Sequence, residues 1–178
     1  MGQKLLAAGR IFASHHQFAL CADPTEIIRD EDNWSEAKMA QGFAGSPSFR
    51  MIGTEAGLND HWIELVASHE PPSKDQWQRI TAVDFRCATG KAHVMSVMDD
   101  TPPISAEIPP GDYIAFIAGQ NIGIDQSTLG EDAELTDAEL SSRRDLEWYR
   151  IYLLRGKAEL TGRLIDRENP LPLNKQAK

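Results

Sequence analysis

The sequence predicts a mainly β protein, built as a two-layer antiparallel β-sandwich with two short helices. Short apolar runs rich in aromatic and β-branched residues recur along the chain, as they do in strands. Glycine and proline turns separate these runs, and only two segments carry the signals that begin a helix. Strands joined mostly by turns are typical of two antiparallel sheets packed face to face.

The length of 178 residues suits a single domain with one buried core. The apolar and charged fractions, 41% and 25%, are ordinary for a globular protein and give no sign of extensive disorder. We expect residues 1–165 to form the sandwich, residues 121–147 to be an acidic insertion within it, and residues 166–178 to be a flexible tail.

The N-terminal third predicts one strand and one helix. Residues Ile11–Cys21 form an apolar run with aromatic content that ends before a proline, which predicts a strand. Asn33 is an N-cap residue with Glu36 three positions later, so a short helix is expected to begin here. Gly42 is placed to end that helix.

The middle of the chain predicts further strands at Ser48–Ile52 and His61–Ser68. Strict alternation in Arg79–Cys87 indicates a strand with one apolar face. The turn at 88–91 then suggests that Ala92–Met98 returns antiparallel to it as a hairpin.

The remaining apolar runs follow the same pattern. Prolines bracket a short strand at Ile104–Ile108, and a buried strand is expected at Tyr113–Ala118. Trp148–Leu154 is a strand candidate rich in aromatic residues. Lys157–Ile165 fits neither the strand nor the helix period well, and both possibilities stay open.

A second helix is predicted to begin at Thr136. Thr136 and Glu139 occupy the N-cap and N3 positions of a capping box, and Leu135 and Leu140 occupy the hydrophobic-staple positions. Asp137 lies in the first turn, near the positive end of the helix dipole. Two carboxylates of the surrounding acidic segment therefore have a structural reason to be there.

Residues 125–140 hold six carboxylates and no Lys or Arg, in a chain whose net charge is −9. The predicted helix leaves four of them unexplained, and these suggest a surface that binds a basic partner. A solvated loop that keeps the protein soluble is the alternative. Two tryptophans near loops are candidate anchors for a partner, because Trp is enriched at interface hot spots. The candidate partner-binding residues are Asp125, Glu131, Asp132, Glu134, Trp34 and Trp77, whereas Trp62 and Trp148 are expected in the core.

The charge balance argues against several classes of partner. Lys and Arg number 18 against 27 Asp and Glu, whereas nucleic-acid binders and proteins of anionic membranes need a positive surface. No apolar run approaches membrane-spanning length, and the N-terminus lacks the core of a signal peptide. We therefore expect a cytoplasmic protein whose Cys21 and Cys87 are reduced core residues.

The search for chemistry finds no recognised catalytic motif. His15 and His16 are adjacent in a predicted strand, so their side chains should leave opposite faces and cannot readily share a metal. The other histidines have no ligand at a telling spacing, and we expect neither metal nor cofactor. Asp99-Asp100 is explained by a turn before a proline, although a hydrolase that uses paired carboxylates stays open.

A set of short segments, in a characteristic order, runs through residues 11–120. These segments are Ser14-His15-His16-Gln17-Phe18, Trp34 with the helix after it, Gly42-Phe43 through Ser48-Phe49-Arg50, Trp62–Val66, Val83–Phe85, Ser96–Met98 and Pro110-Gly111-Asp112-Tyr113. Through them the chain resembles the competence protein J family, whose members inhibit a DNA-entry nuclease in competent bacteria. The resemblance implies a small cytoplasmic β-sandwich that performs no catalysis and binds and blocks a nuclease.

The function that the sequence favours is a non-catalytic inhibitor of a nuclease or of another basic effector protein. The first alternative is a small-ligand binder or hydrolytic enzyme on a β-sandwich or barrel, which would show an apolar cavity with inward-facing histidines. A subunit whose acidic loop contacts a sister chain is the second alternative.

Overall fold

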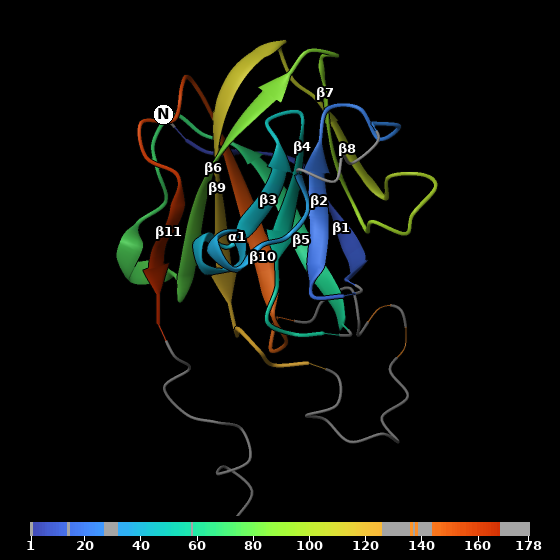
Figure 1. Ribbon diagram of the computed structural model, residues 1–178, viewed down its shortest axis with the longest axis vertical. Coiled ribbons are helices and arrows are strands. Elements are labelled where there is room, and N and C mark those ends of the chain that lie inside the picture. Colours follow the sequence, from blue (N-terminus) through green and yellow to red (C-terminus); the bar gives the residue numbers. More distant parts are fainter. Residues whose placement is uncertain are drawn as a thin grey trace, which may run out of the picture.

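The computed structural model describes residues 2–13, 15–26, 32–57, 59–125, 136, 138 and 144–167. These residues form two stacked β-sheets with little helix (Figure 1), which confirms the predicted mainly β, sandwich-like fold. The six-stranded sheet runs in the order β1 (Lys4–Ala13), β5 (Asn59–Ala67), β10 (Trp148–Arg155), β9 (Gly111–Gln120), β6 (Arg79–Cys87) and β11 (Gly162–Asp166). The five-stranded sheet runs in the order β3 (Phe43–Ser46), β4 (Phe49–Gly53), β2 (Gln17–Cys21), β7 (Lys91–Met95) and β8 (Ile104–Glu107).

The main core lies between the two sheets. Strand β2 contributes Phe18 and Leu20, and the facing sheet contributes Phe85, Ile117 and Tyr149. Each of these residues is at most 2% exposed. The rings of Phe18 and Tyr149 meet across the two sheets with centroids 5.4 Å apart. Strand β2 begins directly after His15 and His16, so this packing fixes the position of these two histidines.

One strand pair departs from the antiparallel prediction. Strand β10 runs parallel to β5, with Tyr149 opposite Ile63 and Leu153 opposite Ala67. Parallel neighbours need a long crossover, and here β6 to β9 lie between the two strands in sequence. The strand periodicity predicted each strand but carries no information on which distant strand it joins.

The predicted single strand Ile11–Cys21 is wrong, because the chain turns in its middle. Strand β1 ends at Ala13 in the six-stranded sheet, and β2 begins at Gln17 in the five-stranded sheet. His15 and His16 between them have φ angles of 56° and 57°. Left-handed backbone is uncommon outside glycine, although His is enriched there among the other residues. The apolar run therefore hid a turn made without glycine or proline.

Helix α1 (Glu36–Gln41) begins two residues later than predicted. Its N-cap is Ser35, whose side chain accepts a hydrogen bond from Lys38 N at 3.3 Å. Glu36 stands in the first turn, where the helix dipole favours a carboxylate. Gly42 ends the helix as predicted, with φ of 88° and its N–H bonded to Lys38 O at 3.0 Å. A 3-10 turn, η2, spans Lys74–Gln76.

The predicted hairpin between Arg79–Cys87 and Ala92–Met98 is also wrong. Strand β6 pairs with β9 and β11, whereas β7 pairs with β2 and β8 of the other sheet. Long-range partners occupy both edges of β6, so the turn after Cys87 carries the chain from one sheet to the other. Turn chemistry alone does not distinguish these two outcomes.

The C-terminal predictions resolve in part. Residues Lys157–Ile165, left open between strand and helix, end in β11. Asp166 belongs to that strand and Arg167 N donates to Gln78 O at 2.8 Å, so the folded body extends past the expected boundary at 165. Of the second predicted helix, Ala138 is helical and Thr136 is exposed, and Leu135, Glu139 and Leu140 lie outside the described residues. No helix in the described part of the chain is long and apolar enough to cross a membrane.

Candidate partner-binding surface

The structure separates the predicted partner-binding residues. Trp77 is 5% exposed and packs its ring against Trp148 and Tyr152, with centroids 5.3 and 6.1 Å away. It therefore offers little area to a partner, and the anchor hypothesis rests on Trp34, which is half-buried. Asp125 is half-buried, and Glu131, Asp132 and Glu134 lie outside the described residues.

Trp62 and Trp148 are half-buried rather than fully in the core. They lie on the outer face of the six-stranded sheet, where the guanidinium of Arg144 covers both rings at 4.5 and 5.4 Å from the centroids. Glu64 in turn holds Arg144 and Arg150 in ion pairs. The outer face therefore combines an apolar cluster around Trp77 with arginines that cover the rings of Trp62 and Trp148.

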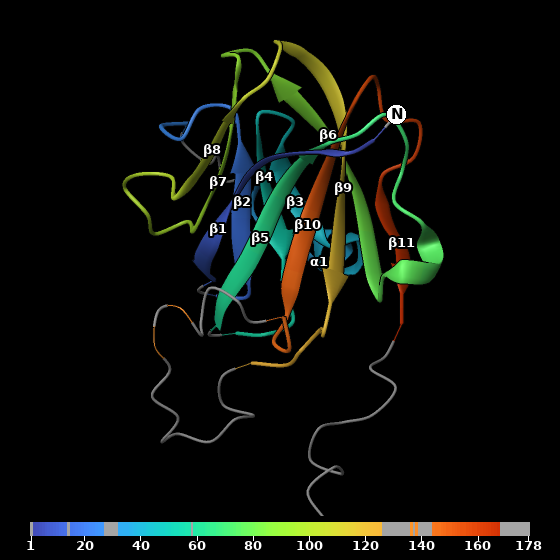
Figure 2. The ribbon, with the colours of Figure 1, turned by 180° about the vertical axis from the view of Figure 1, so that it is seen from behind.

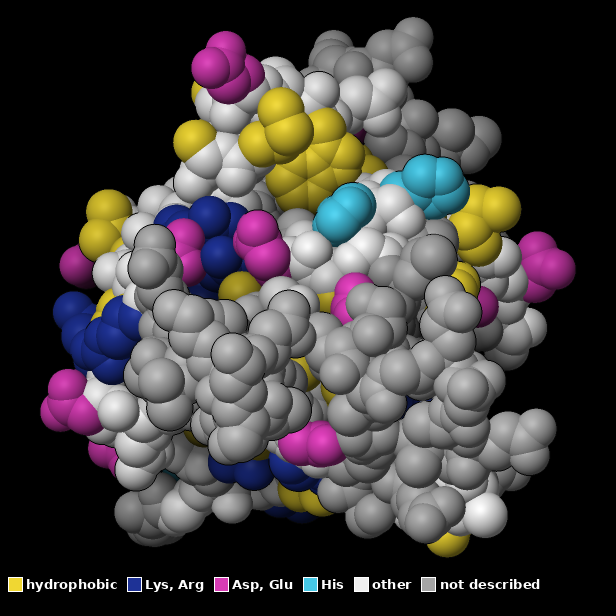
Figure 3. Space-filling model, turned by 90° about the horizontal axis from the view of Figure 1, so that it is seen from below, with side chains coloured by type: hydrophobic (Ala, Val, Ile, Leu, Met, Phe, Trp, Pro, Cys, Tyr) yellow, Lys and Arg dark blue, Asp and Glu magenta, His cyan; other side chains and the backbone are white. Residues whose placement is uncertain are grey.

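A hollow of about 520 Å³ lies at one end of the sandwich, where the β1–β2 turn, α1 and the β4–β5 loop meet. Seen from that end (Figure 3), hydrophobic, histidine and paired charged side chains adjoin one another. We call its most accessible side chains the docking surface: His15, His16, Trp34, Met39 and Glu55.

Local contacts hold the two-histidine turn. Thr54 N donates to His16 O at 2.7 Å, and His16 Nδ1 lies 3.0 Å from Glu55 O. A Cβ at Gly57 would lie 2.9 Å from His16 Cε1, so only glycine lets the ring rest against this backbone. Two consecutive left-handed non-glycine residues cost free energy, and such strain persists only where the surroundings enforce it.

Trp34 and Met39 supply the apolar part of the docking surface. The indole N–H of Trp34 donates to Gln17 Oε1 at 2.6 Å. Its ring packs on a hydrophobic cluster that includes Phe49 and Met51, on the face of the five-stranded sheet that points away from the main core. Met39 projects from α1 and is 58% exposed. A fixed aromatic ring beside an exposed flexible thioether is the kind of surface that proteins use to bind other proteins.

The carboxylate of Glu147, which is fully buried, holds the loops behind the docking surface. It accepts hydrogen bonds from the backbone N–H groups of Glu55, Ala56 and Gly123 at 3.0, 2.8 and 2.6 Å. It also accepts a hydrogen bond from the phenol of Tyr149. Burial and the adjacent carboxylate raise the pKa of Tyr149 well above its ordinary value, so the phenol stays a donor.

A charge network borders the docking surface. Arg79 pairs with Glu55 at 3.1 Å and with Asp166 at 2.9 Å, and Arg163 pairs with Asp166 at 3.0 Å. Burial alone would lower the pKa of Arg79, but the two carboxylates outweigh it and raise the pKa. Glu55 therefore presents a carboxylate that is oriented by Arg79 yet 59% exposed.

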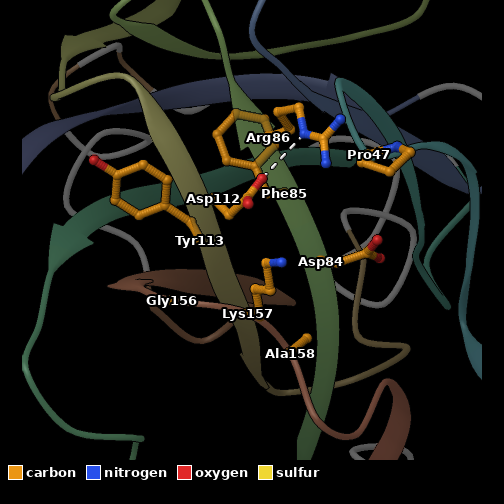
Figure 4. A pocket seen from close by; sticks show the side chains of 9 residues that line it. All are labelled: Pro47, Asp84, Phe85, Arg86, Asp112, Tyr113, Gly156, Lys157 and Ala158. Carbon is orange, nitrogen blue, oxygen red and sulfur yellow. Dashed lines mark hydrogen bonds and ion pairs between the residues drawn. The ribbon is translucent and has the colours of Figure 1, made fainter.

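A further pair of carboxylates lies in a hollow beside β6 and β9. A polar hollow of about 270 Å³ contains Asp84 and Asp112 (Figure 4). Arg86 reaches Asp112 at 3.0 Å, and Asp84 is held by Arg50. Both carboxylates are thus committed to arginine partners. Among the described residues, no three His, Cys, Asp or Glu side chains converge in a way that could hold a metal ion.

The polypeptide matches the family model of competence protein J, ComJ, over residues 10–128. The chain belongs to the ComJ family. The match spans two thirds of the chain, including the docking surface, and ends inside the acidic segment. Among curated protein sequences, none matches the chain significantly.

Two solved structures share the ComJ fold with this chain. One is ComJ of Bacillus subtilis, an inhibitor of the DNA-degrading activity of NucA, with a TM-score of 0.61 and 16% identity. It aligns with 88% of this chain and 100% of its own. The other is the product of crocagin biosynthetic gene J, with a TM-score of 0.52, 11% identity, and coverage of 85% and 98%. At these identities the likeness establishes the fold.

Of the residues at and behind the docking surface, the sequence analysis proposed Trp34 for a partner and did not single out Met39, Glu55 or Glu147. An exposed Met on a six-residue helix gives no periodic signal of its own. Glu147 follows an acidic segment and precedes a strand, and nothing in the sequence distinguishes it from the other carboxylates. Only the convergence of three distant backbone segments shows that it is buried.

Proposed function

We propose that this chain is a non-catalytic protein that binds and inhibits a DNA-degrading nuclease. The observation that carries the proposal is membership of the ComJ family, supported by a fold that aligns with all of Bacillus subtilis ComJ, a nuclease inhibitor.

The docking surface is the part of the chain that we assign to the nuclease. It combines a fixed indole, an exposed methionine and an oriented carboxylate, and Gly123 and Glu147, near the two ends of the expected acidic insertion 121–147, lie next to Glu55. A nuclease binds phosphate through a positive surface, and an acidic inhibitor would be steered to that surface. The basic character of the partner, and a cytoplasmic location for the complex, remain predictions.

The test begins with the purified chain as bait in a lysate of its source, at low and at moderate salt. The captured nuclease is then assayed on plasmid DNA with increasing amounts of the chain. We expect activity to fall to a minimum near equimolar inhibitor. Undiminished DNA cleavage at saturating inhibitor would refute the proposal.

An acidic protein could also lower cleavage by removing a divalent metal from the nuclease or by coating the DNA. The assay is therefore repeated with a large excess of Mg²⁺ and with the chain incubated with DNA alone before a mobility-shift gel. Inhibition that persists in excess Mg²⁺, with no shift of the DNA, assigns the effect to contact between the two proteins.

A further inference from the structure

A second cavity, of about 460 Å³, opens at the other end of the sandwich. It is lined by the start of β1, the ends of β5, β8 and β10, and the start of β9. The docking surface lies past the end of β1 and before the start of β5, so the two sites are separated by the length of these strands. Figure 2 shows the N-terminal end of the chain at this upper end, away from the lower loops.

Residues of the main core form the bottom of this upper cavity. Ile108, Tyr113 and Leu153 line it and belong to the cluster between the sheets, and Leu6 packs against the same cluster. Leu6 lies at a β-bulge, since Leu5 pairs with Val66 and Ala7 pairs with Leu65. A bulge redirects a side chain from the regular ladder, and bulges are common beside functional sites.

The rim of the upper cavity is cationic, although the chain as a whole carries a charge of −9. Lys4, His69 and Arg155 are exposed on it. Within the described ranges none of the three forms an ion pair, and the hydrogen bond of Arg155 to Pro110 O is long, at 3.4 Å. Glu107 is the carboxylate of the lining, so positive groups predominate.

We propose that the upper cavity binds a small amphipathic carboxylate. The apolar body of the ligand would lie against Leu6, Ile108 and Leu153, and its carboxylate would face Lys4 and Arg155. The volume lies within the usual range for small-molecule sites, which combine an apolar lining with a few polar groups that fix orientation. This proposal is independent of nuclease inhibition, because it uses the opposite end of the molecule.

Octanoate serves as the probe, with octylamine and octanol as a cation and a neutral molecule of equal chain length. Binding is followed by calorimetry and by methyl NMR of the leucine and isoleucine side chains. We expect octanoate to bind and to shift the methyls of Leu6 and Ile108. Octylamine and octanol are expected to bind at least roughly tenfold more weakly than octanoate, because they lack the attraction between a carboxylate and the cationic rim.

Charge reversal tests the rim directly. Lys4→Glu and Arg155→Glu change exposed side chains and should each weaken octanoate binding roughly tenfold. Lys74→Glu makes the same charge change on an exposed residue of η2, outside the cavity lining, and should leave binding unaltered. Circular dichroism verifies that all three variants are folded.

Four results would overturn the proposal. The first is the absence of octanoate binding at millimolar concentration, and the second is equal binding of octanoate and octylamine. The third is an octanoate shift confined to methyls around the docking surface. The fourth is an unchanged affinity in both rim variants, which would show that the carboxylate of the ligand does not bind at the rim.

Discussion

The phenol of Tyr149 donates a hydrogen bond to the carboxylate of Glu147 two residues before it, and both side chains are buried. The same carboxylate accepts from the backbone of the β4–β5 loop and of the segment after β9. The start of β10 therefore determines where two loops near the docking surface lie. A buried carboxylate that accepts several hydrogen bonds is costly to disturb, because each donor would be left unsatisfied.

Replacing Glu147 with Gln should lower the free energy of unfolding by about 3 kcal/mol, since charge-assisted hydrogen bonds to backbone donors are lost. Urea denaturation measures the change. Tyr149→Phe removes one donor to the same carboxylate and should cost about 1 to 2 kcal/mol. A Glu147→Gln protein as stable as the parent would show that the carboxylate does not anchor these loops.

Met39→Ala should weaken binding of the nuclease about five- to tenfold, because an exposed apolar side chain is lost from the docking surface. Its effect on stability should be small, since Met39 is 58% exposed. Leu5→Ala is the matched control, because Leu5 is also 58% exposed and lies at the start of β1, at the opposite end of the sandwich. Equal affinities for the two variants in surface plasmon resonance would move the interface elsewhere.

Reversing the charge of Asp125, Glu131, Asp132 and Glu134 to Lys should slow association with a basic nuclease and flatten its dependence on salt. The control reverses four exposed carboxylates outside this segment, Glu70, Asp75, Asp100 and Glu159, and so keeps the net charge change equal. Stopped-flow association rates at several ionic strengths compare the two proteins. If both slow to the same degree, net charge rather than the acidic segment directs the encounter.

Gly45→Ala should destabilise the fold by about 2 kcal/mol or more, because of strained backbone and a steric clash. Gly45 has φ of 85°, and an added Cβ would lie 2.2 Å from Phe49 O. Gly90 has a similar φ of 79°, and an added Cβ would meet nothing closer than 3.8 Å, so Gly90→Ala reports the backbone cost alone. Thermal unfolding of the two variants separates the clash from the strain, and equal melting temperatures would contradict the close contact.

Stability should fall as pH rises above 9. Burial, reinforced by Asp23 and Glu26, raises the pKa of the Cys21 thiol from 9.0 to about 12. The folded state therefore holds a proton that the unfolded state releases above pH 9, and the stabilisation disappears progressively between pH 9 and 12. In Cys21→Ala this contribution, at most about 1.4 kcal/mol per pH unit, should be missing. Urea denaturation between pH 8 and 10 compares the slopes; identical slopes would exclude a role for Cys21.

Periodicity located most strands because alternating burial is a local property. Arg79–Cys87 was predicted with its observed limits, and Trp148–Leu154 to within one residue. The break at His15-His16 escaped prediction, because neither glycine nor proline marks it and the tertiary contacts of Thr54 and Gly57 enforce it. Strand order failed for a related reason: pairing of β6 with β9 and β11 is decided by distant segments.

The candidate site was predictable only in part. Trp34 stood out in the sequence because tryptophan near a loop is unusual, but the same reasoning selected Trp77, which is buried. Burial distinguishes these two residues, and the surroundings that bury Trp77 come from β10. Glu147 shows the converse, since a carboxylate that looks solvated in sequence is the most buried acid of the described chain.

The place of β10 in the six-stranded sheet has a consequence for biosynthesis. Strands β5 and β9 leave the ribosome before β10 does, yet β10 is inserted between them. Until residues 148–155 emerge, the nascent chain exposes two open strand edges that could pair with other polypeptides. Cotranslational folding therefore cannot complete this sheet from the N-terminus onward, and the nascent chain is expected to need chaperone protection until its central strand arrives.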